Sequence, residues 1–284
     1  MNNFFVISNV ARDPGCKTAE MIADYLTSKG KKCEYLGIER DDYDDSDAFK
    51  QINSLSDDIE CVIVLGGDGT IIQISGVLAK KKLPLIGVNL GNLGFLAEVD
   101  KDKITPALDR LIEDNFFYED RMMLSGTVVI NGCETDCTYA FNDIVVKSRG
   151  NKVGYFDLDV NGRRLTSFSG DGLIFATPTG STAYSMSAGG AVLEPNAEMI
   201  LITPICPLKG VSRSIVLSAE DEVVVKVPFK STKRHNRITA FFDGGESFDL
   251  MPGDEVIIRK ASEYVRFIKF SKESFLDVLA RKMS

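Results

Sequence analysis

Short apolar runs alternate with helical patterns over the first third of the chain. The apolar runs cover residues 4–8, 33–38, 61–67 and 84–90. After the first run, the spacing of apolar residues predicts a helix from about Pro14 to Lys29, with a proline in its first turn and Gly30 directly after its end. Apolar strands separated by helices are typical of a parallel sheet with crossover helices. This part of the chain therefore predicts an α/β domain.

The pattern changes after one more helix, which is predicted over Lys103 to Glu113. Apolar and polar residues then alternate with a period of two, as in half-buried strands, at residues 126–130, 155–160, 222–227 and 255–260. The end of the chain returns to helical spacing. We expect an α/β nucleotide-binding domain over residues 1–118, a β-rich domain over 119–264, and a helix within 265–284 that returns to the first domain.

Length and composition fit a protein with two ordinary cores. The chain has 284 residues, of which 44% are hydrophobic. The formal net charge of −8 argues against a nucleic-acid partner, because a chain of this charge repels phosphate backbones. The first residues lack the features of a secretory signal, and no apolar run reaches the length of a membrane span. We expect a cytoplasmic protein with neither a membrane nor a nucleic-acid partner.

One short segment is strongly acidic. It contains Asp41, Asp42, Asp44, Asp45 and Asp47 and has no apolar periodicity. Charge runs of this kind are usually solvated. We expect a loop there rather than a metal site.

The sequence GGDGT at residues 66–70 is the clearest chemical signal. It follows an apolar strand that ends at Leu65 and precedes a helical run over 71–78. Ligands of open α/β sheets bind at the carboxyl ends of strands, and glycines let the backbone approach a phosphate. Asp68 would then face the nucleotide as a lone carboxylate. Taken alone, the motif also fits a tight turn with Asp68 as a helix cap.

Two further segments have the composition of ligand-binding turns. The sequence NLGNLGFL at residues 89–96 follows another apolar strand, and its glycines allow a second close backbone approach. Asn142 and Asp143 end the run TYAFND and offer donors and acceptors suited to base edges and ribose hydroxyls. Each segment is also consistent with an ordinary turn.

The longest informative stretch is DGLIFATPTGSTAYSMS at residues 171–187. In it, an apolar strand meets a turn of small hydroxylated residues, which suits phosphate or sugar contacts. The alternative is a capped helix start between Thr179 and Thr182. Tyr184 suits either stacking on a base or packing in a core.

Taken together, these segments resemble the NAD kinase family. GGDGT, NLGNLGFL, the Asn-Asp pair and DGLIFATPTGSTAYS followed by AGG occur in the family's order and spacing. The resemblance runs from about residue 60 to about residue 260 and includes TPICP at 203–207, DGG at 243–245 and GDEV at 253–256. GGDGT alone is shared with diacylglycerol and sphingosine kinases, and phosphofructokinases have a similar motif. The TPTGSTAYS block is what selects NAD.

The resemblance implies a Rossmann-like N-terminal domain and a β-sandwich-like C-terminal domain that binds NAD. The implied reaction transfers a phosphoryl group from ATP or polyphosphate to the 2′-hydroxyl of the adenosine ribose of NAD and makes NADP. The implied cofactor is a divalent cation, Mg²⁺ or Mn²⁺. The implied assembly is a homo-oligomer, a dimer or a tetramer.

By position in the motifs, Asp68 is the implied catalytic proton acceptor. The implied nucleotide- and substrate-binding residues are Gly67, Gly69, Thr70, Phe95, Asn142, Asp143, Asp171, Thr182, Ala183, Tyr184, Ser185 and Ser187. No motif fixes a metal site, although Asp68 is able to bind a metal that bridges the donor phosphates. Leu208 stands where many family members have His, Gly245 where Gln is frequent, and Ser169 where some have Arg. These departures bear on dinucleotide affinity and on the choice between NAD and NADH.

Other kinds of protein have less support. The chain has one histidine and neither a GxxxxGK[ST] loop nor an HExxH motif, which argues against P-loop and zinc-hydrolase chemistry. A lipid or other small-alcohol kinase needs an apolar acceptor pocket or a membrane-binding face, and no basic amphipathic helix supplies one. A nucleotide-binding sensor without turnover is the non-enzymatic alternative, and the intact GGDGT argues against it.

Overall fold

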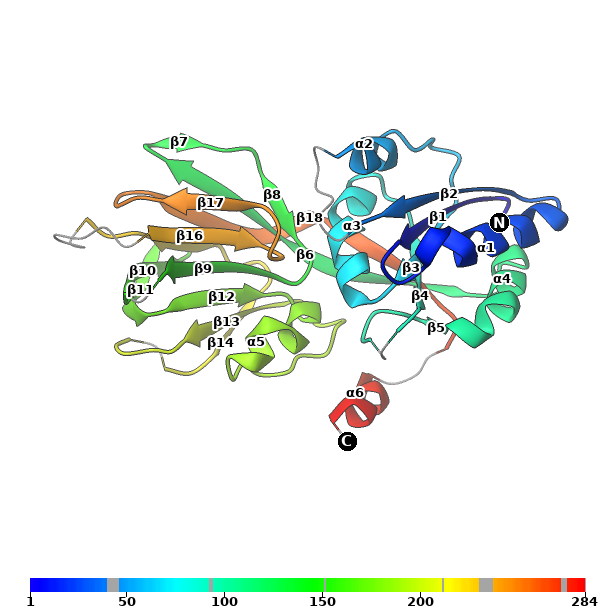
Figure 1. The fold of residues 1–284 in the computed structure, drawn as a ribbon. Coiled ribbons are helices and arrows are strands. Elements are labelled where there is room, and N and C mark those ends of the chain that lie inside the picture. The colour runs from blue at the N-terminus through cyan, green and yellow to red at the C-terminus, as the bar shows by residue number, and fades with distance from the viewer. Residues whose placement is uncertain are drawn as a thin grey trace. The chain divides into compact units, whose positions relative to one another are not determined.

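The computed structural model of the protein describes residues 1–39, 46–91, 94–150, 152–210, 212–229, 237–271 and 275–283. It divides into two compact units, of which one contains Met1–Arg121 with Tyr264–Ser284 and the other contains Met122–Glu263. The first unit is α/β and the second consists of antiparallel sheets (Figure 1). The predicted fold class is confirmed. None of the described helices is both long enough and apolar enough to span a membrane.

A parallel sheet forms the centre of the α/β unit, with strand order β2-β1-β3-β4. The bounds are Asn3–Asn9 for β1, Lys32–Ile38 for β2, Cys61–Gly66 for β3 and Leu85–Asn89 for β4. The short strand β5 (Val99–Asp100) pairs with β4, and Phe267 of β18 (Glu255–Lys269) pairs with Leu85. All of β3 is buried, as expected for a central strand covered on both faces.

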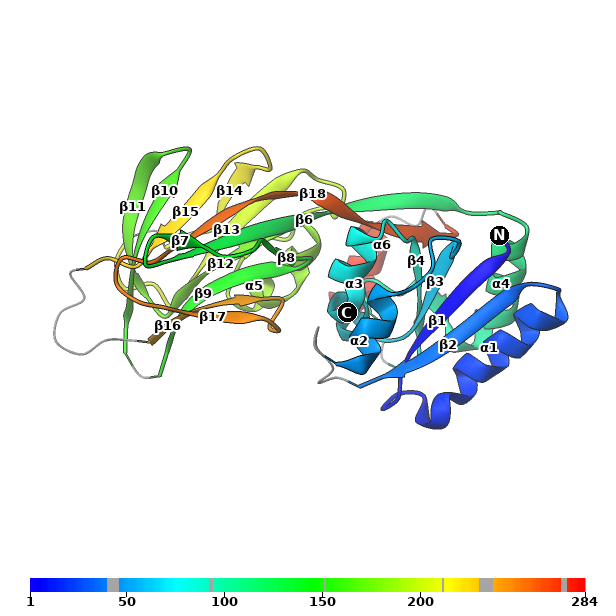
Figure 2. The same ribbon diagram turned by 90° about the horizontal axis from the view of Figure 1, so that it is seen from above.

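Helices cover both faces of this sheet (Figure 2). On one face, α1 (Lys17–Ser28) and α4 (Ile104–Ile112) share a core with alternate strand residues such as Phe4 and Ile63. On the other face lies α3 (Asp68–Lys80), which buries Ile71, Ile74 and Leu78. The remaining helical elements of the unit are α2 (Asp47–Asn53), α6 (Phe275–Met283), and 3-10 turns at Pro14–Cys16 and Lys101–Lys103.

Two predictions for this unit need correction. The helix predicted from Pro14 is interrupted, because Gly15 and Cys16 have φ of 71° and 54°, and α1 begins only at Lys17. Asp47 belongs to α2 rather than to an acidic loop. The hydroxyl of Ser46 accepts the Phe49 N–H at 3.2 Å, and the buried Phe49 and Ile52 hold this short helix against the unit. Asp41, Asp42, Asp44 and Asp45 lie outside the described residues.

Two antiparallel sheets pack face to face in the second unit (Figure 1). One contains β11-β10-β15-β18, with β6 beside β18 and with β7 and β8 beside β6; the other has the order β14-β13-β12-β9-β16-β17. The bounds are Phe117–Ile130 for β6, Cys133–Glu134 for β7, Thr138–Ala140 for β8, Asp143–Arg149 for β9, Gly154–Val160 for β10, Arg163–Gly170 for β11, Gly172–Ala176 for β12, Met199–Ile205 for β13, Ile215–Ser218 for β14, Val223–Lys226 for β15, Arg237–Phe242 for β16 and Ser247–Leu250 for β17.

The core of this unit lies between its two sheets. Phe156 and Phe168 enter it from one sheet, and Phe175 and Phe242 enter it from the other. A smaller cluster around Ile174 lies on the outer face of the second sheet. There the chain forms a 3-10 turn, η3 (Thr179–Thr182), and the short helix α5 (Tyr184–Ser187), and Ala188 and Leu193 pack against the cluster. The TPTGSTAYS block is therefore held beside this sheet.

Candidate functional site

Asp68 is the first residue of α3 and follows directly after β3 and Gly67. It is not the helix cap, since Gly67 takes the cap position and no side chain caps the helix. Instead, Asp68 Oδ2 accepts the N–H of Phe95 at 2.7 Å and Oδ1 accepts the N–H of Leu96 at 3.1 Å. The side chain is still 28% exposed. The structure thus fixes this carboxylate and leaves part of it accessible.

The glycines around Asp68 serve two different purposes. A Cβ on Gly66 would overlap Thr70, and a Cβ on Gly94 would overlap the Asp68 carboxylate. In contrast, a Cβ on Gly67 or Gly69 would meet no atom within 4 Å. The first two glycines allow close packing inside the unit. The other two leave open space at the start of a 13-residue helix, where backbone N–H groups favour phosphate.

Thr70 and Phe95 are two other residues of this unit that the sequence predicts to bind the nucleotide; Thr70 is buried and Phe95 is half-buried. Thr70 is 4% exposed, and its hydroxyl accepts the side-chain N–H of Asn9 at 3.1 Å. Thr70 therefore stabilises the turn through a hydrogen bond inside the unit. The ring of Phe95 lies near the ring of Phe275 in α6, with centroids 6.4 Å apart. Asp68, Gly67, Gly69 and Phe95 therefore gather around the start of α3.

In the β-sheet unit, Asn142 lies in the turn before β9 and Asp143 is the first residue of that strand, and this segment is held from two sides. Asp243 accepts the backbone N–H groups of Phe141, Asn142 and Asp143 at 2.6, 2.7 and 3.0 Å. Thr177 donates its hydroxyl to the Phe141 carbonyl at 2.7 Å and its N–H to the Asn142 carbonyl at 2.9 Å. These bonds fix the backbone of both residues, of which Asn142 is half-buried and Asp143 is buried.

Asp243 and Thr177 are not among the site residues that the sequence predicts. Both nevertheless lie in motifs that carry the family resemblance, Asp243 in DGG and Thr177 directly before PTGSTAYS. Gly180 belongs to the same arrangement, because a Cβ there would overlap the Asn142 backbone. The signal was present in the sequence, but only the folded chain brings DGG and ND together.

The carboxylates of Asp143 and Asp243 influence each other. Burial raises the pKa of Asp143 to about 7, and the charge of Asp243 adds to this shift. Burial also raises the pKa of Asp243 to about 6, although its three backbone N–H donors act in the opposite direction. Near neutral pH this pair resists carrying two full negative charges. An Asp143 that keeps a proton is able to donate a hydrogen bond as well as accept one.

The residues of η3 and α5 divide into exposed and buried ones. Tyr184 is 40% exposed, and Ser187 is exposed as well. Thr182 and Ala183 are half-buried, with the Thr182 hydroxyl donating to the Thr179 carbonyl at 3.2 Å. Ser185 is fully buried and shares a 2.8 Å hydrogen bond with Thr203. In this structure Ser185 anchors the short helix rather than facing solvent.

A cavity of about 430 Å³ lies beside Tyr184 and Asp171. Lys147 lines it too, with its ammonium 5.8 Å from the Tyr184 ring centre and 5.1 Å from that of Phe241. Arg149 adds a second cation, 5.4 Å from the same Phe241 ring. The lining thus combines cations, aromatic rings and one carboxylate, which suits a ligand with phosphates and planar rings.

Ser169, Leu208 and Gly245 are the three positions at which the sequence departs from the residues that the family resemblance leads us to expect. Ser169 and Leu208 are neighbours, since the Leu208 N–H donates to the Ser169 carbonyl at 2.8 Å. Leu208 is 72% exposed. Gly245 lies in the turn that contains Asp243, and its N–H donates to the Phe242 carbonyl at 2.9 Å. All three belong to the β-sheet unit that also holds the Asn-Asp turn.

Models of two protein families match the chain in succession. The ATP-NAD kinase N-terminal domain matches residues 16–116, and the ATP-NAD kinase C-terminal domain matches residues 142–270. An NAD kinase from Lachnospira eligens is 36% identical over 293 residues, with both chains covered completely. An NAD kinase from Carboxydothermus hydrogenoformans is 39% identical over 234 residues, which cover 82% of each chain.

Solved structures give the same result. An NAD kinase from Archaeoglobus fulgidus in complex with ATP is 25% identical, with a TM-score of 0.75 and 98% of each chain covered. A yeast NADH kinase complexed with NADH shares the fold, with a TM-score of 0.81 at 21% identity over 100% of this chain and 87% of that one. On the matches to both domain families and to relatives over their full length, the chain belongs to the NAD kinase family.

Proposed function

We propose that this NAD kinase transfers the terminal phosphoryl group of ATP to the 2′-hydroxyl of the adenosine ribose of NAD, with Asp68 as the proton acceptor. The observation that carries the proposal is the fixed Asp68 carboxylate at the start of α3. Two backbone N–H groups orient it, and Gly67 and Gly69 leave open space beside it. This combination supplies a base and a phosphate-binding helix start in one place.

In this reaction the position of the proton acceptor matters more than its strength as a base. Phosphoryl transfer passes through a loose transition state, so the acceptor hydroxyl loses its proton late and an ordinary carboxylate is a sufficient base. The new bond forms between the ribose oxygen and the transferred phosphorus while the bond to the ADP oxygen breaks. The proton of the hydroxyl goes to Asp68. Its hydrogen bonds from Phe95 and Leu96 keep the carboxylate oriented during this step.

We include a divalent cation, Mg²⁺ or Mn²⁺, in the proposed reaction. Among the described residues no group of three or more His, Cys, Asp or Glu side chains is placed to hold a metal ion. The proposed cation would be held mainly by the donor phosphates, as Mg²⁺ often is, and Asp68 is a carboxylate that could add a protein ligand. When bound, the cation would offset charge on the donor phosphates.

For the dinucleotide we propose residues of the β-sheet unit. The exposed or half-buried ones are Asn142, Asp171, Thr182, Ala183, Tyr184 and Ser187, with Lys147 added from the cavity lining. We include Asp143 as well, although it is only 6% exposed. Asn142 and Asp143 supply hydrogen-bonding groups for a base or ribose, and Tyr184 supplies a stacking surface. Ser185 and Thr70 would act through the elements they support, because both are buried.

An acceptor assay tests the proposed function. Purified protein with Mg²⁺, ATP and NAD should form a product that an NADP-specific dehydrogenase reduces, and phosphorus NMR should place the new phosphate on the 2′-oxygen. Parallel reactions with NADH and with polyphosphate would measure preference for acceptor and donor. Phosphorylation of diacylglycerol or sphingosine without formation of NADP would contradict the proposal, and so would nucleotide binding without any turnover.

Two further expectations remain predictions. We propose a homo-oligomer, a dimer or tetramer, which light scattering of the purified protein would measure. We also propose a cytoplasmic location, which fractionation of the source cells would test.

A further inference from the structure

The last turn of α6 brings a lysine beside the proposed base. Lys282 Nζ lies 3.9 Å from Asp68 Oδ2 and 3.7 Å from the centre of the Phe95 ring. The Lys282 side chain is only 19% exposed. This ammonium is therefore held at the start of α3 by a carboxylate and an aromatic ring, both attractive to a cation.

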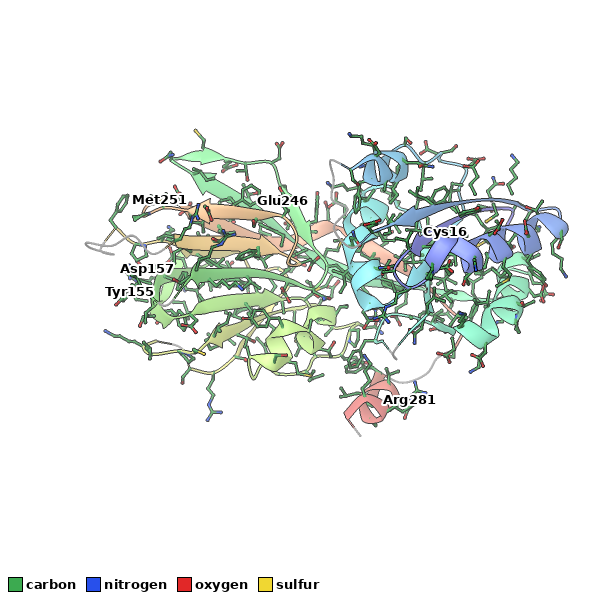
Figure 3. The ribbon with its side chains drawn as sticks, viewed as in Figure 1. Cys16, Tyr155, Asp157, Glu246, Met251 and Arg281 are labelled. Atoms are coloured by element: carbon green, nitrogen blue, oxygen red, sulfur yellow. The ribbon has the colours of Figure 1, made fainter. Side chains whose placement is uncertain are left out.

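The helix presents one face to this position. Phe275 and Lys282 are seven residues apart, which is about two helical turns, so both side chains lie on the same face of α6. Both contact Phe95, Phe275 through its ring and Lys282 through its ammonium. Arg281, the preceding residue on the helix, is exposed (Figure 3). Two residues on one face of α6 therefore contact Phe95, and this pair of contacts positions Lys282.

Lys282 does not donate a hydrogen bond to Asp68. A distance of 3.9 Å is beyond a hydrogen bond, and the Asp68 oxygens already accept two backbone N–H groups. Burial lowers the pKa of Lys282, while the charge of Asp68 raises it. A partly desolvated ammonium with donors to spare is suited to a phosphate oxygen.

We propose that Lys282 binds the transferred phosphoryl group of the donor beside Asp68. This rests on the proposed function of Asp68. Lys282 takes no proton in the reaction; its charge stabilises the phosphoryl oxygens while the ribose oxygen attacks, the bond to the ADP oxygen breaks, and the ribose proton moves to Asp68. The C-terminal helix thereby contributes a catalytic residue that the GGDGT motif does not contain.

The test compares Lys282→Ala, Lys282→Arg and the control Arg281→Ala. Lys282→Ala should lower kcat/KM for ATP about 10²-fold, the usual effect of removing one transition-state donor. Its KM for NAD and its melting temperature should stay close to those of wild type. Lys282→Arg should recover most of the activity. Added ethylamine should raise the rate of Lys282→Ala and leave the rates of the other variants unchanged. Removal of a lysine with only a structural role would not be rescued in this way.

Three outcomes would overturn the proposal. Activity of Lys282→Ala within about twofold of wild type would remove Lys282 from the reaction. A rise in activity would make α6 an inhibitory contact. A loss that neither arginine nor ethylamine restores would make Lys282 structural. A wild-type protein that forms no NADP, or an active Asp68→Asn, would instead refute the proposed function, so the two failures are distinguishable.

Discussion

The Asp243 carboxylate accepts the backbone N–H of Asn142 at 2.7 Å, one of three such bonds that fix the Asn-Asp turn. The two residues are 101 positions apart in the chain. Asp243 adopts φ of 49°, a left-handed conformation that aspartate and asparagine tolerate better than most residues. The dinucleotide contact that we propose for Asn142 would therefore depend on a residue that does not itself need to touch the ligand.

The first prediction concerns this bond. Asp243→Asn keeps the shape and the left-handed backbone, but its amide cannot accept all three N–H groups. Each lost bond to a charged acceptor costs about 1.5 to 3 kcal/mol of unfolding free energy, and we expect KM for NAD to rise at least about tenfold. Glu246→Gln, on the same turn and exposed, is the control and should behave like wild type. Denaturant unfolding and steady-state kinetics measure both effects; an unchanged KM would show that the turn keeps its geometry without Asp243.

The second prediction is a pH dependence of stability. The pKa of Asp143 rises from 3.8 to about 7 on folding, so the folded protein holds a proton that the unfolded chain loses. Its contribution to stability is complete below about pH 4 and disappears as the pH rises through about 7. Asp143→Asn removes this titration. The variant should gain melting temperature over wild type at pH 8, with less gain at pH 5.

The size of that gain is limited by the coupling with Asp243. We expect the free energy of unfolding gained by Asp143→Asn over wild type to be about 1 to 2 kcal/mol larger at pH 8 than at pH 5. An isolated group with this pKa shift would give a larger difference. The control is Asp24→Asn, which changes an exposed aspartate on α1. Its melting temperature should differ from that of wild type by the same amount at both pH values. If Asp143→Asn changed the melting temperature by the same amount at pH 5 and pH 8, Asp143 would already be ionised in the folded protein at pH 5.

The third prediction uses two glycines with opposite surroundings. In Gly94→Ala the new Cβ would overlap the Asp68 carboxylate, which must then move. Displacing a catalytic group by about 1 Å costs on the order of 10²-fold in kcat/KM. Gly76→Ala, inside α3 with no atom within 4 Å of the new Cβ, should keep full activity and stabilise the helix by about 0.5 to 1 kcal/mol. Normal kinetics of Gly94→Ala would show that the turn and the carboxylate can separate without consequence.

The periodicity of apolar residues predicted the strands of the first unit and the β-rich character of the second, because burial patterns are local properties. It missed α2, whose seven residues contain only two buried apolar side chains. It also missed the break at Gly15 and Cys16, which depends on backbone angles that no apolar pattern encodes. The motifs placed Asp68 at a strand end. They did not reveal that the backbone N–H groups of Phe95 and Leu96 bind its carboxylate, since these residues are 27 and 28 positions further along the chain.

The same reason explains the residues that only the structure supplied. Asp243 and Lys282 reach their positions through long-range contacts, with Asn142 in one case and with Asp68 and Phe95 in the other. Nothing in the local sequence of α6 distinguishes Lys282 from Arg281. Lys147 likewise reads as an ordinary strand residue until α5 brings Tyr184 next to it. Side-chain neighbours of this kind follow from tertiary packing, not from the pattern of the segment.

The most direct test of the central claim is the turnover number of Asp68→Asn in the NADP-forming assay, beside wild type and Asp24→Asn. Asparagine preserves the size of the side chain but cannot take the ribose proton, so kcat should fall about 10²- to 10⁴-fold while the melting temperature stays close to that of wild type. Raising Mg²⁺ or Mn²⁺ should not restore the rate if the loss is that of a base. An unchanged kcat would contradict the role of Asp68, and full recovery with added metal would make it a metal ligand instead.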